Sequence, residues 1–282
     1  MAIFTNQATL SYNNTITTSN VTTGELLEVL SIIKTALSST YERQDTIVYV
    51  VSIANTGAAP FTALTVTDDL GAYDIDGTTV TPLDYVPGSL RYFVNGALQA
   101  TPAVTAGPPL SASGISVPAG GNALLVYEAR LNSFAPPTTG STITNTATVS
   151  GDLAAPLSDS ATVSAASAPF LTITKSLSPL TVSENGQLTY TFVIQNSGSA
   201  AAVATDDASI SDLFDPILSD LTVTFNGAPW AEPADYTYNE STGLFTTVPG
   251  RITVPAATFT QNTDGSWVTT PGTAVLTVTG TV

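Results

Sequence analysis

Residues 170–198 read FLTITKSLSPLTVSENGQLTYTFVIQNSG, and the architecture of the whole chain follows from this stretch. At its start, apolar residues alternate with Thr, Lys and Ser, which is the period of a β-strand that buries one face. Elsewhere Thr, Val, Ser and Ala are frequent, and Gly, Pro, Asn and Asp interrupt the chain at short intervals. This pattern is typical of an all-β sandwich.

The second half of the chain repeats the first. Residues 41–57, YERQDTIVYVVSIANTG, align without a gap with residues 182–198, which indicates two copies of one domain. Because FLTITKSL at residues 170–177 alternates as a strand, we expect the matching LSIIKTAL at residues 30–37 to be a strand as well. We reject a helix there, although the apolar residues of GELLEVLSIIKTAL have a helix-like spacing.

The second copy lacks its last strand. In the first copy, ITNTATVSG at residues 143–151 is followed by LSDSATVSA, but the second copy stops at Val282 without an equivalent. A near-copy, FTNQATLSY, stands at residues 4–12 and is followed by TITTSNVTTG. The predicted parts are an N-terminal donor-strand arm at residues 1–25, Ig-like domain 1 at residues 26–166, and Ig-like domain 2, lacking its last strand, at residues 167–282.

The arm is patterned to complete a sandwich in another copy of the chain. A sandwich that lacks a strand exposes an apolar groove, and a strand from a neighbour fills it by β-augmentation. Apolar burial and about eight ladder hydrogen bonds supply on the order of 5 to 10 kcal/mol before entropy costs. Domain 1 separates the arm from its own domain 2, so the contact is heterologous and builds an open filament. The donor face consists of Phe4, Asn6, Ala8 and Leu10.

An alternative is that the arm is an accessory edge strand or a flexible terminus. A second alternative is that the arm closes the fold of its own chain, which is then a monomeric cell-surface adhesion or ligand-binding module of Ig-like repeats.

Polar residues point inward at matched positions in both copies. The chain has two lysines, and strand alternation places each on an apolar face, together with one Asp and one Asn. Buried charges need partners, because an unpaired charge in a core costs several kcal/mol. We therefore expect these side chains to meet. The candidate sets are Lys34, Asp68 and Asn145 in domain 1, and Lys175 and Asp212 with Asn6 of the next subunit in domain 2.

Two outcomes fit such a triad. Burial lowers the pKa of Lys and raises that of Asp, so the amine becomes a nucleophile while a protonated carboxyl polarises the Asn carbonyl. The product is a Lys–Asn isopeptide bond with loss of ammonia, and the triad resembles that of the self-crosslinking Ig-like domains in Gram-positive pili and adhesins. The other outcome is an unreacted hydrogen-bond cluster.

The repeated segments also resemble a known family. KSLSPLTVSENGQLTYTFVIQNSG, LTVTDDL, YVPGSLRYFVNG, VPAGGNALLVYEARL and ITNTATVS are similar to the bacterial conserved-repeat domain, the domain-of-unknown-function-eleven family of Ig-like surface modules. The resemblance covers both halves and implies an extracellular structural role. The chain departs from the family at its C-terminal end, where a closing strand is expected.

Composition excludes several other functions. The formal net charge of -16 repels nucleic acid and anionic lipid, so we expect neither partner and no membrane insertion. Without Cys or His the chain has no disulfide, no catalytic triad and no ordinary zinc site, so we expect no enzyme turnover, no cofactor and no metal. The first residues do not resemble a signal peptide. The expected location is extracellular, on a cell or a spore, since a spore appendage made inside a mother cell needs no leader.

Overall fold

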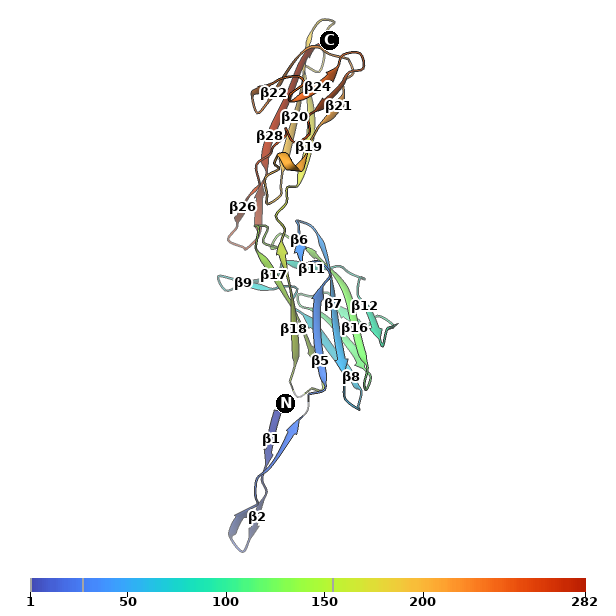
Figure 1. Cartoon of the computed structure of the whole chain (residues 1–282). Helices are drawn as coiled ribbons and strands as arrows, with labels where there is room; N and C mark the ends of the chain where they lie inside the picture. Colours follow the sequence, from blue (N-terminus) through green and yellow to red (C-terminus); the bar gives the residue numbers. More distant parts are fainter. Residues whose placement is uncertain (1, 27, 154) are drawn as a thin grey trace.

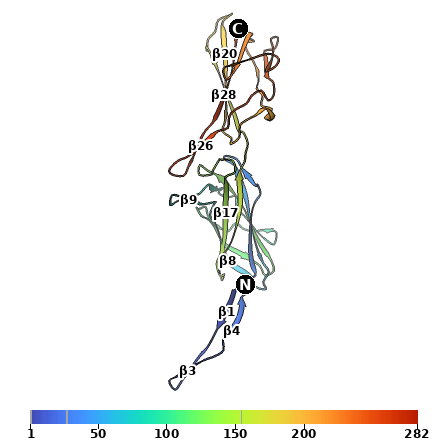
Figure 2. The same ribbon diagram turned by 60° about the vertical axis from the view of Figure 1, so that its left-hand side comes forward.

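The computed structural model describes residues 2–26, 28–153 and 155–282. The molecule is elongated, with a β-hairpin arm at one end, two β-sandwiches in line after it, and the C-terminus at the far end (Figures 1 and 2). In the described residues, the regular elements are β-strands, almost all paired antiparallel, besides the 3-10 helix η1 (Ala204–Asp206). The predicted all-β Ig-like fold is confirmed. The boundaries after residues 25 and 166 stay predictions.

In the first sandwich, alternation places one face of each strand in the core. Along β7, Tyr49, Val51 and Ile53 are buried, and the residues between them are partly exposed. One sheet has the order β13-β12-β16-β7-β5 with β11 beside β16, and the other has the order β14-β15-β8-β17-β18-β6. The bounds are β5 (Leu30–Ala36), β6 (Thr40–Tyr41), β7 (Thr46–Asn55), β8 (Phe61–Asp68), β11 (Leu83–Tyr85), β12 (Arg91–Val94), β13 (Ala97–Leu98), β14 (Ala103–Thr105), β15 (Leu110–Val117), β16 (Asn122–Leu131), β17 (Thr142–Ser150) and β18 (Leu157–Ala165).

The second sandwich has its own core, which includes Phe214, Phe245 and Leu276. One sheet has the order β19-β20-β28-β22-β23, and a shorter sheet has the order β21-β25-β24. The bounds are β19 (Leu171–Ser178), β20 (Gln187–Asn196), β21 (Ser211–Leu213), β22 (Ser219–Phe225), β23 (Ala228–Trp230), β24 (Tyr236–Asn239), β25 (Leu244–Thr247) and β28 (Gly272–Thr281).

The strand pairs that carry the two lysines have the same register. Lys34 lies opposite Val51 in the β5–β7 pair, and Lys175 lies opposite Phe192 in the β19–β20 pair. Val51 and Phe192 are therefore separated along the chain by the same number of residues as the two lysines. The strand predicted at residues 30–37 is therefore confirmed, and β5 and β19 are structural equivalents.

The second sandwich is open on one side. In the first sandwich, β17 pairs with both β8 and β18, and β18 lies against β5. Among the described residues of the second sandwich, no strand takes the place of β17 or β18. As a result, β21 lies at the edge of its sheet, and every residue of β19 is exposed.

The arm is a long two-part hairpin. β1 (Ala2–Asn6) pairs with β4 (Thr22–Leu26), and β2 (Thr9–Tyr12) pairs with β3 (Thr15–Thr18). Its turn consists of Asn13 and Asn14, both with positive φ, which is the geometry of a type I′ hairpin turn. The side chains of residues 3–23 are all exposed, because the arm projects away from both cores (Figure 1).

A second hairpin joins the two sandwiches. In the first sandwich, β15 connects to β16 through residues 118–121 alone. The equivalent connection in the second sandwich holds β26 (Thr258–Gln261) and β27 (Trp267–Thr270), which we call the bridging hairpin. The backbone N–H of Trp267 donates to the Ser133 carbonyl of the first sandwich at 2.7 Å. The tip contacts the small hairpin β9 (Tyr73–Ile75) and β10 (Thr78–Val80) of the first sandwich.

Candidate crosslinking sites and acceptor groove

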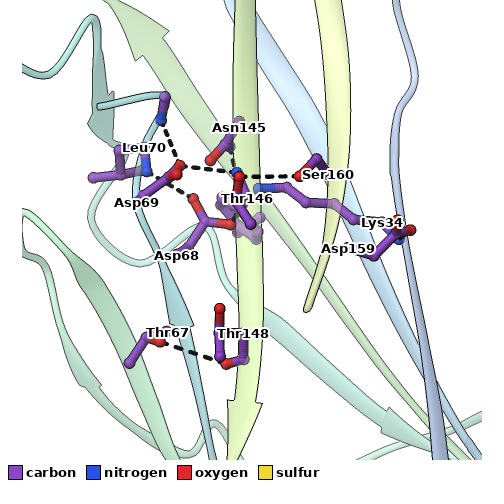
Figure 3. A network of polar contacts seen from close by, with 12 residues as sticks. Lys34, Thr67, Asp68, Asp69, Leu70, Asn145, Thr146, Thr148, Asp159 and Ser160 are labelled. Atoms are coloured by element: carbon purple, nitrogen blue, oxygen red, sulfur yellow. Dashed lines mark hydrogen bonds and ion pairs between the residues drawn. The ribbon is translucent and has the colours of Figure 1, made fainter. Parts of the chain in front are cut away.

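Lys34, Asp68 and Asn145 come together in the first sandwich, as predicted. They lie on β5, at the end of β8, and on β17, so the site spans both sheets. Lys34 Nζ donates to Asp68 Oδ2 at 2.5 Å, and their side chains are 0% and 2% exposed. Figure 3 shows Lys34 reaching toward the segment of β17 that carries Asn145. The pair is sealed from water.

Asp68 is held by further donors. The Leu70 backbone N–H donates to Asp68 Oδ1 at 3.0 Å, and the hydroxyl of Tyr127 donates to Oδ2. The backbone of Lys34 is fixed as well, because its N–H donates to Asp159 Oδ2 at 2.7 Å and so connects β5 to β18. The carboxyl of Asp68 therefore has a fixed orientation next to the lysine.

Asn145 is fully buried and only partly satisfied. Its Nδ2 donates to the Tyr127 hydroxyl at 3.4 Å, while its Oδ1 makes no hydrogen bond of regular geometry. Burial raises the pKa of the neighbouring Tyr49, and the Asn145 amide partly offsets that shift. A buried carbonyl without a regular donor is uncommon in proteins. It leaves this oxygen available to a protonated carboxyl.

The environment also favours a neutral amine. Burial lowers the pKa of Lys34, and the attraction of Asp68 opposes this effect without overcoming it. The Nζ atom lies 4.9 Å from the centroid of the Tyr49 ring. A lysine with a lowered pKa gives up its proton more readily, and nucleophilic attack requires the neutral amine.

Lys175 and Asp212 also meet, as an ion pair, but in an open site. Their side chains are 38% and 18% exposed, so Lys175 is not buried in the isolated chain. The reason is the missing cover over β19. The Lys175 Nζ is 4.1 Å from the centroid of the Tyr190 ring and 5.6 Å from that of Phe214, so aromatic rings hold the ammonium by cation–π contact.

Asn6 does not reach Lys175 within the chain, because the arm and the second sandwich lie at opposite ends of the molecule (Figures 1 and 2). The donor-face residues Phe4, Asn6, Ala8 and Leu10 are all exposed on the arm.

The open side of the second sandwich exposes apolar side chains, and we call this region the acceptor groove because an inserted hairpin would lie over it. Its floor is the inner face of β19, where Ile173 is 52% exposed and Leu177 is 39% exposed. At the matched positions, Leu171 of β19 is 36% exposed, whereas Leu30 of β5 is only 7% exposed. The edge of β21 adds a row of unpaired backbone groups beside this apolar face.

Sequence reasoning missed Tyr127 and Tyr49. They face each other across the β7–β16 ladder, and their rings stack with centroids 5.7 Å apart. The available signal was alternation in NALLVYEARL, which places Tyr127 inward. The recurring Asn-x-Gly has a structural role: the Asn55 Nδ2 donates to the carbonyls of Ala59 and Pro118, and Asn196 makes equivalent bonds in the second sandwich.

No group of three or more acidic side chains in the described ranges is arranged to hold a metal ion. Within those ranges, no helix has the length and apolar character to cross a membrane.

No family model matches the chain, and no curated protein matches it significantly in sequence. The resemblance to the conserved-repeat domain therefore stays a prediction. Among solved structures, the fold is similar to the pilus backbone of Streptococcus pneumoniae, with a TM-score of 0.34 and 10% identity over 90% of this chain and 50% of that chain.

Two further solved structures are similar. The major pilin subunit of Bacillus cereus has a TM-score of 0.36 and 11% identity, over 96% of this chain and 73% of that chain. The collagen-binding subdomain of the Enterococcus faecalis surface protein ACE has a TM-score of 0.33 and 6% identity, over 50% of this chain and 99% of that chain. At these TM-scores and identities the similarity carries no argument about function, which has to come from the residues of this chain.

Proposed function

We propose that the chain is a structural subunit of an extracellular bacterial filament on a cell or spore surface. Subunits polymerise head to tail, and the arm of one subunit inserts into the acceptor groove of its neighbour. One observation carries this proposal: among the described residues, the second sandwich has no counterparts of β17 and β18, and the arm presents a copy of that hairpin at the other end of the molecule.

The outer face of the arm supports the equivalence. β17 and β18 carry a ladder of paired hydroxyls on their outer face, and the arm repeats it with Thr5 opposite Thr23 and Thr9 opposite Thr18. Such cross-strand pairs stabilise a hairpin. The pairs in the first sandwich are Thr144 with Thr162, Thr146 with Ser160, and Thr148 with Ser158, at 2.8 to 3.0 Å.

The inner face supports it as well. Phe4 lies opposite Gly24, and its ring occupies the space that a Cβ on Gly24 would fill. The matched pair in the first sandwich is Ile143 opposite Val163. One large and one small residue thus replace two of intermediate size. Insertion covers the apolar floor of β19 and pairs the free edge of β21, and both effects favour assembly.

We further propose that isopeptide bonds crosslink the first sandwich and the joint between subunits. A proton passes from the Lys34 ammonium to Asp68, and the neutral Nζ attacks Cγ of Asn145. The protonated Asp68 stabilises the oxygen that gains charge, then relays the proton released by Nζ to Nδ2. The Cγ–Nδ2 bond breaks, ammonia leaves, and an Nζ–Cγ amide remains. Lys175, Asp212 and Asn6 of the next subunit perform the same step at the joint.

A matched pair of variants tests the polymerisation. Leu10→Glu places a charge on the inner face of the arm, and Thr9→Glu places the same charge on the outer face. We expect the first to stay monomeric by size exclusion and electron microscopy, while the second forms filaments like the unchanged chain. If the unchanged full chain is a monodisperse monomer, the filament is wrong and a monomeric surface adhesion module is the function to test.

Intact mass tests the bonds separately. The monomeric Leu10→Glu variant should be lighter than its sequence mass by one ammonia, and Leu10→Glu combined with Asn145→Ala should show no such loss. Asn6→Ala should abolish an SDS-resistant ladder without preventing filaments. A ladder that persists in Asn6→Ala contradicts the bond at the joint.

A further inference from the structure

Tyr127 occupies a special place in the first crosslinking site. Its hydroxyl donates to Asp68 Oδ2, the oxygen that also accepts from Lys34 Nζ, and it accepts from Asn145 Nδ2 at 3.4 Å. One atom thus contacts both the acid and the nitrogen that leaves as ammonia. The side chain is 2% exposed and wedged between two rings, Tyr49 at 5.7 Å and Tyr85 at 6.4 Å between centroids.

We propose that Tyr127 is a positioning residue for the Lys34–Asn145 bond, because its hydroxyl fixes the amide of Asn145 and the carboxyl of Asp68 in one geometry. This inference rests on the isopeptide bond proposed above. If the Asn145 amide could rotate freely, either Nδ2 or Oδ1 could face Asp68. The contact with the Tyr127 hydroxyl keeps Nδ2 on the side of Asp68, which relays the proton. The hydroxyl itself neither gains nor loses a proton.

The chemistry of Tyr127 suits this task. Burial and the nearby Asp68 raise the pKa of its hydroxyl well above the usual value of a tyrosine. The group stays a neutral donor while the amine and carboxyl exchange their proton. Two groups that are held in the right orientation react faster, because less conformational freedom is lost on the way to the transition state.

Tyr49 provides a matched control. It is as deeply buried, it stacks on Tyr127, and its hydroxyl lies near the Asn145 amide without a regular hydrogen bond. Tyr49→Phe and Tyr127→Phe therefore remove the same atom from neighbouring rings of one core. Only the second variant removes a contact to Asp68.

The experiment follows bond formation in time. The full chain and each variant are made by cell-free translation, samples are quenched in acid, and loss of ammonia is read by intact mass across a range of pH. We expect Tyr127→Phe to slow the loss by about tenfold to a hundredfold, the effect of one hydrogen bond to a charged group. We expect Tyr49→Phe to stay within about twofold of the unchanged chain.

A second measurement separates positioning from folding. Each tyrosine variant is also made together with Asn145→Ala, which cannot react, and the two double variants are compared by thermal unfolding. Similar unfolding temperatures with a slow reaction in Tyr127→Phe alone support the inference. Equal rates for the two single variants, or a loss of rate that follows a loss of stability, overturn it. If the unchanged chain never loses ammonia, the isopeptide proposal itself fails.

Discussion

Lys34 and Lys175 hold matched positions on β5 and β19, and each is paired with an aspartate. They differ in their contact with water, since one side chain is fully buried and the other is 38% exposed. Insertion of the arm would both supply Asn6 and cover Lys175, so the joint has no amide to react with before the two subunits meet.

This difference predicts selective labelling. In the monomeric Leu10→Glu variant, an amine-acylating reagent should modify Lys175, and Lys34 should stay unmodified because it is buried. In filaments of the unchanged chain, Lys175 should be protected as well. Peptide mapping by mass spectrometry measures both sites in one sample. Equal labelling of Lys175 in the two states contradicts insertion of the arm over β19.

The crosslink in the first sandwich predicts a loss of stability in Asn145→Ala. A covalent link between residues 34 and 145 closes a loop of about 100 residues, which by chain entropy is worth about 4 to 5 kcal/mol. We expect the free energy of unfolding of the first sandwich to fall by about this amount, as measured by denaturant titration. Thr144→Ala, on the outer face of the same strand, should change it by less than about 1 kcal/mol.

The turn of the arm holds its two strands together as a hairpin, which is the form in which the arm would insert. Asn13 and Asn14 have positive φ, a conformation that costs a β-branched residue about 1 to 2 kcal/mol. The double variant Asn13→Val with Asn14→Val should therefore slow filament growth, measured by light scattering.

Two controls bound this effect. Thr15→Val with Thr18→Val adds the same residues in β3, where they suit a strand, and should leave growth unchanged. Asn14→Gly should also assemble normally, since glycine adopts positive φ without strain. Slow growth in all three variants would show that the arm tolerates no change at its tip, whatever the turn geometry.

The elements could be predicted from the sequence where the two copies could be compared. β5 was predicted to be a strand because β19 alternates clearly, and the arm was interpreted by counting strands in each copy. Alternation also placed Lys34, Asp68 and Asn145 inward. These inferences need only local periodicity and the order of segments along the chain.

The remaining features depend on packing between sheets. Alternation places Tyr127 inward, but its contact with Asp68 is set by the distance between two sheets, which a single strand does not encode. Alternation places Lys175 on the apolar face of β19, but its exposure depends on whether another strand covers that face. The position of the bridging hairpin depends on contacts across two sandwiches.

At the scale of the whole molecule, charge opposes assembly. Each subunit carries a formal net charge of -16, and the donor face of the arm is uncharged. Salt screens repulsion over a Debye length of about 10 Å at 0.1 M. We expect filament growth to be faster at 0.3 M than at about 0.03 M NaCl, as measured by light scattering at equal protein concentration. Faster growth at low salt would point to an attractive ionic contact at the joint.

The bridging hairpin gives the two kinds of junction different mechanics. Between the sandwiches of one subunit, Trp267 bonds to Ser133, and Gly265 lies against Ile75 and Val80. At the proposed junction between subunits, the equivalent connection would be the short turn at residues 118–121. Cryo-electron microscopy of filaments should show a narrow spread of angles within subunits and a wide spread between them.

Glycine variants test the origin of that difference. Gly265 and Gly227 both have φ near +80°, but a Cβ on Gly265 would meet Ile75 and Val80, whereas one on Gly227 would meet nothing within 4 Å. Gly265→Ala should therefore widen the angles within subunits, and Gly227→Ala should leave them unchanged. If neither variant alters the angles, the linker between the sandwiches sets the geometry.

The assembled fibre would then be a series of rigid rods, each two sandwiches long, connected by hinges at a regular spacing. Such a fibre bends without breaking, because a lateral force turns the hinges while the inserted hairpins carry the tension along the axis. The hairpin insert in one loop of the second sandwich thus sets the length over which the fibre can follow a curved surface.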